Sequence, residues 1–203
     1  MQANDTTYNI CKQIKLGHAQ MPQLYQPIAD LIHAQWGLRP LYIALQQATT
    51  AEGASILQIC MDSWTDCMPL RQPAAERLII AQLKTLRPLQ KVYISLEAFS
   101  PAALSDIMER MPRGAIAGLL PALDPLLWHI GTYGSITFFV YTEQQKKECQ
   151  HNGSLERWLD AVYQLIATYD PEHLCSREAL YIDIDSKENF DTNYASNWYY
   201  YYK

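Results

Sequence analysis

The sequence predicts an α+β fold with about six strands in a largely antiparallel or mixed sheet and helices packed on it. Short apolar stretches with alternating or continuous patterns recur along the chain and are typical of strands. Longer stretches with apolar residues three and four positions apart are typical of amphipathic helices, and the two kinds intermix. Apolar residues make up 49% of the 203 residues and charged residues 18%, so the chain can bury a sizeable core.

Residues 1–20 are polar and unpatterned, so we expect a loosely ordered lead-in. A helical pattern begins at Pro22, and Gly37 stands where a glycine commonly ends a helix. Beyond it the sequence predicts strands at 41–45 and 55–61, a helix from Pro73 that ends before Pro88, and a strand at 91–96. The first two strands are typical of an antiparallel hairpin with a long loop.

The second half of the chain continues the same mixture of elements. We predict a helix from Ser100 to about Met111, a short helix around 126–130, a strand at 135–141, a short helix capped by Thr142, a helix from Ser154, and strands at 179–184 and 198–202. No internal repeat and no linker is evident in the sequence. We therefore expect one α+β domain over residues 21–203.

Charge and cysteine content limit the possible partners and compartments. The chain has 16 Lys or Arg and 21 Asp or Glu, a net charge of −5, and no basic run of the kind that binds nucleic acid. A basic protein partner suits this surface better. The five cysteines form no C-x-x-C pair and fit a reducing compartment. Because no secretory signal or membrane-spanning stretch is evident, we expect a soluble, cytoplasmic protein without membrane partners.

The common catalytic and cofactor motifs are missing from the sequence. It contains no G-x-x-x-x-G-K-[ST], G-x-G-x-x-G, G-x-S-x-G or H-E-x-x-H pattern. We therefore expect no cofactor and favour a protein without catalytic activity. A Cys–His nucleophile, formed by Cys60 or Cys67 with His33 or His129, is an alternative, but Cys60 lies in an apolar strand where thiols are usually inert.

Two sets of residues could bind metal. Cys149, His151, His173 and Cys175 form two mirrored pairs with the ligand types that zinc prefers, although the spacing within each pair is unusual. Surface histidines and partly buried thiols are the ordinary interpretation of these four residues, and we expect no metal there.

Asp183 and Asp185 are the second set, because strand alternation places both carboxylates on one face. Together with Asp62 or Asp66 they could hold Mg²⁺ or Mn²⁺ in a phosphate or phosphodiester hydrolase. The ordinary interpretation is the solvent face of a half-buried strand.

The C-terminus is rich in aromatic residues and follows an acidic stretch. In a final strand, one set of rings would pack on the core and the other would face outward, unless a helix or loop covers it. Tyr and Trp are enriched in binding hot spots. We predict a docking face made of Asp183, Asp185, Glu188, Asp191, Trp198, Tyr199 and Tyr201.

This face predicts a protein that binds a basic protein partner. Its carboxylates would steer and pair with Lys or Arg, and its aromatic rings would supply buried area. One biological form of this function is a bacterial immunity protein that neutralises a basic toxin of the nuclease type. A homodimer formed by edge pairing of the C-terminal strand is a further hypothesis.

Overall fold

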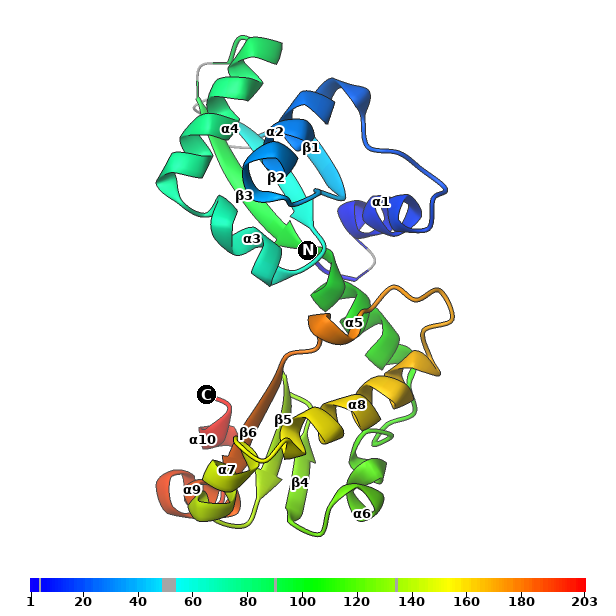
Figure 1. The fold of residues 1–203 in the computed structure, drawn as a ribbon, viewed down its shortest axis with the longest axis vertical. Coiled ribbons are helices and arrows are strands. Elements are labelled where there is room, and N and C mark those ends of the chain that lie inside the picture. Colours follow the sequence, from blue (N-terminus) through cyan, green and yellow to red (C-terminus); the bar gives the residue numbers. More distant parts are fainter. Residues whose placement is uncertain (4, 49–53, 90, 134) are drawn as a thin grey trace. The chain divides into compact units, whose positions relative to one another are not determined.

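The computed structural model describes residues 1–3, 5–48, 54–89, 91–133 and 135–203. The chain divides into two compact units, Met1–Asp106 and Ile107–Lys203, where the sequence indicated one domain. Each unit contains a three-stranded sheet and the helices that cover it (Figure 1). The predicted α+β class is therefore confirmed, with six strands in the described part of the chain.

The first unit is built on a sheet of order β1-β2-β3, in which β2 runs antiparallel to β1 and parallel to β3. Its elements are α1 (Thr6–Lys15), η1 (Gln23–Tyr25), α2 (Gln26–Trp36), β1 (Tyr42–Gln47), β2 (Ser55–Met61), α3 (Trp64–Leu70), α4 (Pro73–Leu86), β3 (Val92–Ala98) and the larger part of α5 (Phe99–Arg110). Ile32, Leu57, Ile59 and Leu83 are fully buried in its core. The predicted hairpin is confirmed.

The predicted loosely ordered lead-in at residues 1–20 is wrong for half of its length, because residues 6–15 form α1. Asp5 caps this helix by accepting a hydrogen bond from the backbone N–H of Tyr8, at 2.7 Å. Tyr8 and Cys11 lie three residues apart on one helix face, and both are buried. The Tyr8 ring also stacks on Phe99, with centroids 5.3 Å apart. A narrow apolar face is therefore enough to dock an otherwise polar helix.

The second unit is built on a sheet of order β4-β5-β6, with β5 antiparallel to β4 and parallel to β6. Its elements are η2 (Ala117–Leu119), α6 (Leu120–Leu123), β4 (Leu127–Gly131), β5 (Ile136–Val140), α7 (Glu143–Cys149), α8 (Ser154–Ala167), η3 (Arg177–Ala179), β6 (Ile182–Ser186), α9 (Lys187–Tyr194) and α10 (Trp198–Tyr201). Helix α8 lies along the sheet (Figure 1). Its Trp158 packs on one sheet face against Phe138, with ring centroids 5.3 Å apart. The other face carries the aromatic residues of the C-terminus.

Two sequence predictions in this unit are wrong. Residues 127–131 form β4 rather than a helix, because the wholly buried strand β5 lies a few residues away and supplies its hydrogen-bonding partner. Residues 198–201 form α10 rather than a strand. The chain turns through positive φ at Ala195 and Ser196, and the Asn197 side chain then caps the helix by accepting from Tyr199 N–H.

The two units repeat the same order of elements. Each contains an antiparallel hairpin, a seven-residue helix, a fourteen-residue helix, a strand parallel to the second hairpin strand, and a further helix. The seven-residue helices α3 and α7 both begin at a capping box, at Ser63 and at Thr142.

Hydrogen bonds also occupy equivalent places in the two units. Ser100 N–H donates to Asp62 O at 2.9 Å in the first unit, and Glu188 N–H donates to Tyr141 O at 3.2 Å in the second. Each bond ties the helix after the parallel strand to the residue that follows the second hairpin strand. The chain therefore contains a repeated structural unit that the sequence did not reveal.

Candidate functional site

The seven residues of the predicted docking face all lie in the second unit, on β6, α9 and α10. They belong to the face of the sheet opposite α8, where α10 packs. The structure separates them into residues that hold α10 in place and residues that remain exposed. This division decides which of them can meet a partner.

Asp185 lies at the centre of a buried hydrogen-bond network. Lys146 Nζ donates to its Oδ1 at 2.8 Å, and Asn189 Nδ2 and Tyr201 Oη donate to its Oδ2 at 2.8 Å each. The backbone N–H of Ser186 adds a further bond at 2.8 Å. Asp185 is 7% exposed, so its carboxylate is committed to these partners. The structure therefore leaves Asp185, one of the predicted docking residues, little accessible surface for a partner.

The same network shifts two pKa values in opposite directions. Burial by itself would raise the pKa of the Asp185 carboxyl, but the hydrogen bonds from Lys146, Tyr201, Ser186 and Asn189 outweigh burial and lower it. Burial and the hydrogen bond to Asp185 raise the pKa of the Tyr201 phenol. Both shifts keep a carboxylate facing a neutral phenol, which fixes α10 to β6. Tyr201 is therefore a structural anchor.

Trp198 is the centre of an aromatic cluster under α10. Its ring lies 4.1 Å from Phe190 and 5.9 Å from Trp128 in stacked orientations, and meets Phe139 edge-on at 5.2 Å. Lys187 lies over the Trp128 ring at 5.3 Å from its centroid. Trp198 is only partly exposed, so it serves packing more than docking.

Other side chains of β6, α9 and α10 are exposed. Tyr199 and Tyr200 are 67% and 57% exposed, and Asp183 is exposed on β6. Glu188 is exposed as well, although one of its oxygens accepts the backbone N–H of Glu143 at 2.9 Å and so caps α7. Tyr200 was not among the residues of the predicted docking face, which was chosen for a C-terminal strand that does not form.

Asp191 is partly exposed, between the buried Asp185 and the exposed Asp183 and Glu188. It pairs with Lys187 one helical turn earlier, and Ser196 Oγ donates to its other oxygen at 2.7 Å. The hydrogen bond from Lys187 is the main reason why the pKa of Asp191 is lowered. Its charge is already balanced locally, which weakens its contribution to an acidic face.

The candidate zinc ligands do not form a site. Cys149 and Cys175 are buried, whereas His151 and His173 are exposed. Over the described ranges of the chain, no three or more His, Cys, Asp or Glu side chains are grouped so that they could hold a metal ion. Burial raises the pKa of Cys149, which keeps this thiol protonated.

The carboxylates proposed as Mg²⁺ ligands do not form a site either. Asp62 accepts from Lys15 at 2.6 Å and from Ser100 at 3.2 Å, and Asp66 belongs to the capping box of α3. Both lie in the first unit, whereas Asp183 and Asp185 lie in the second. Asp183 Oδ1 accepts from the backbone N–H of Ile184 at 2.8 Å. Each of the four carboxylates thus accepts a hydrogen bond from the protein itself, and none of them joins a metal-binding group within the described residues.

The cysteine candidates for nucleophilic catalysis are inert. The hydrogen bond with Cys11, together with burial, raises the pKa of Cys60. Burial raises the pKa of Cys67 to about 11. A nucleophilic cysteine needs a lowered pKa and access to solvent, and both thiols are fully buried. Neither thiol is suited to attack a substrate.

The net charge of the chain is concentrated in one unit. The second unit contains 8 Lys or Arg and 13 Asp or Glu, whereas the first contains 8 of each. The full charge of −5 therefore belongs to the unit that exposes Tyr199 and Tyr200. Among the helices that the structure describes, none is long and apolar enough to cross a membrane.

Comparison with known proteins does not identify a family for this chain. No family model, curated protein or solved structure matches the chain.

Proposed function

We propose that this chain is a non-catalytic protein that binds a basic protein partner through the acidic, tyrosine-bearing surface of its second unit. The proposed docking surface consists of Asp183, Glu188, Tyr199 and Tyr200, which are all exposed. The observation that supports the proposal is that the unit with the exposed Tyr199 and Tyr200 also holds the whole net negative charge of the chain. An immunity protein that neutralises a basic toxin is one biological form of such a function.

The mechanism divides the work between two sets of residues. Asp185, Tyr201 and Trp198 fix α10 rigidly, so the exposed tyrosines are held in place before binding and lose little conformational freedom on binding. Asp183 and Glu188 would attract Lys and Arg side chains and raise the association rate. The tyrosine rings would then be buried against the partner and supply most of the affinity.

A pair of matched double variants tests this function. Asp183→Lys with Tyr199→Ala alters the docking surface, and Glu76→Lys with Tyr93→Ala makes the same chemical changes in the first unit. Glu76 is exposed and Tyr93 is 50% exposed. Each variant is used to capture proteins from native lysate, with quantitative mass spectrometry as the readout.

The proposal predicts a basic protein that the unchanged chain and the first-unit variant capture equally, and that the docking-surface variant loses. It also predicts that capture falls as the salt concentration rises. Equal capture by both variants, or equal loss from both, would contradict it.

A further inference from the structure

A second surface feature of the same unit lies away from the residues discussed so far. It is a pocket of about 440 Å³ between the end of α5, the loop at 111–117 and the end of β4. Pockets that bind small molecules commonly have volumes of roughly 300–1,000 Å³. Its lining is partly apolar, with Met111, Ile116 and Ile130 all buried.

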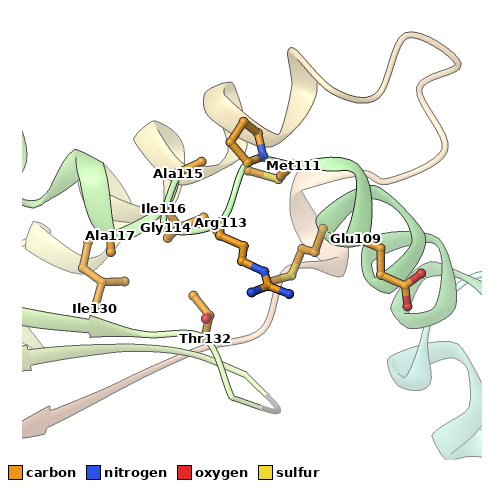
Figure 2. A pocket seen from close by; sticks show the side chains of 11 residues that line it. Glu109, Met111, Arg113, Gly114, Ala115, Ile116, Ala117, Ile130 and Thr132 are labelled. Atoms are coloured by element: carbon orange, nitrogen blue, oxygen red, sulfur yellow. The ribbon is translucent and has the colours of Figure 1, made fainter.

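Arg113 is the one basic side chain among the residues that line this pocket. Figure 2 shows its guanidinium extended across the pocket, between Thr132 on one side and Glu109 on the other. Within the part of the chain that the structure describes, the guanidinium makes no hydrogen bond or ion pair. This is a contrast with Arg177, which pairs with both Glu156 and Asp160. Arg113 thus has its donors free for a ligand.

We infer that this pocket binds a small carboxylate that carries an apolar group. A guanidinium presents parallel N–H donors that match the two oxygens of a carboxylate. Thr132 lines the same pocket, and its hydroxyl can donate a further hydrogen bond to a ligand (Figure 2). Met108, Ala115 and Ala117 also line the pocket and are partly or fully exposed, so they offer an accessible surface for the apolar group of the ligand.

The electrostatics of the pocket favour a single negative charge over a double one. Glu109 is exposed on the same lining, and the unit as a whole has more acidic than basic residues. A phosphate dianion would be repelled by this surplus, whereas one guanidinium balances one carboxylate. The inferred ligand is therefore a monoanion, and it is bound at a place distinct from the docking surface.

Nuclear magnetic resonance of the full chain with ¹³C-labelled methionine methyl groups tests this inference, because Met108 and Met111 line the pocket. The probes are phenylacetate and phenylacetamide, which share shape but differ in charge. The variants are Arg113→Gln and, as a matched control in the first unit, Arg77→Gln. Arg77 is an exposed arginine of α4.

We expect phenylacetate to shift the two methyl signals in a saturable way. Phenylacetamide, and phenylacetate with Arg113→Gln, should bind about 10-fold more weakly or worse, because each lacks the charge-assisted hydrogen bonds. Arg77→Gln should bind like the unchanged chain. The inference is overturned if neither methyl signal shifts in a saturable way, if the two probes bind equally, or if Arg113→Gln leaves phenylacetate binding unchanged.

Discussion

Replacing Asp185 with asparagine probes the network that fixes α10. The amide keeps one acceptor oxygen, but its NH₂ group must then face either the Lys146 ammonium or the Asn189 and Tyr201 donors. Either orientation sets donor against donor in a buried place and leaves a charge without its partner. Removing one partner of a buried ion pair costs about 3–5 kcal/mol, and Lys146 is only partly buried. We expect a loss of about 2–4 kcal/mol in the free energy of unfolding.

Urea unfolding followed by tryptophan fluorescence measures this loss, since Trp128, Trp158 and Trp198 lie in the same unit. Asp183→Asn is the matched control, because it makes the same change two residues away on an exposed side chain. It should alter the free energy of unfolding by less than about 0.5 kcal/mol. If the two variants were equally stable, the network would not hold α10, and Asp185 would return as a candidate for partner binding.

Three further predictions concern the same unit. Folding lowers the pKa of the Asp185 carboxyl, so its stabilising contribution is present above about pH 4 and is lost as the pH falls through the folded pKa. The difference in unfolding free energy between the unchanged chain and Asp185→Asn should therefore shrink below about pH 4. A Cβ at Gly131 would lie 2.5 Å from the Tyr202 hydroxyl, so Gly131→Ala should displace the C-terminus. It should lower the free energy of unfolding by about 1–3 kcal/mol and speed carboxypeptidase cleavage, and unchanged cleavage would contradict this packing. Trp198→Ala should cost about 2–4 kcal/mol in urea unfolding through lost ring contacts with Phe190, and a cost below 1 kcal/mol would contradict the aromatic cluster.

The sequence predicted most of the fold where local patterns and tertiary packing agree. The strands predicted at 55–61 and 135–141 are mostly apolar, and the strands that form there, β2 and β5, are almost wholly buried. The capping box at Thr142 and the amphipathic helix from Ser154 also form as predicted. In each case the local signal and the long-range partner favour the same element.

The errors arise where a local pattern allows two outcomes. A run of aromatic residues at 198–202 suits a strand, yet a single cap at Asn197 and two residues with positive φ direct it into a helix. The hypothesis of a dimer through a C-terminal strand loses its structural basis, because that strand does not form. The repeat was invisible because equivalent positions after the strands hold unlike residues, such as Cys67 and Lys146.

The candidate site was only partly predictable for a related reason. Sequence identifies acidic and aromatic residues but cannot say which of them satisfy each other. Asp185 and Tyr201 are sixteen residues apart and bond directly, which removes both from the exposed set. Arg113 gave no signal in the sequence, because a single arginine in a Pro-Arg-Gly loop resembles any surface residue.

The central claim is that the second unit binds a basic partner with its acidic, tyrosine-bearing surface. Hydrogen exchange of backbone amides, compared between the free chain and its complex with the captured partner, tests it most directly. The account predicts slower exchange in β6, α9 and α10, with little change in β1, β2 and α4. Slower exchange confined to the first unit, with none in residues 182–203, would contradict it.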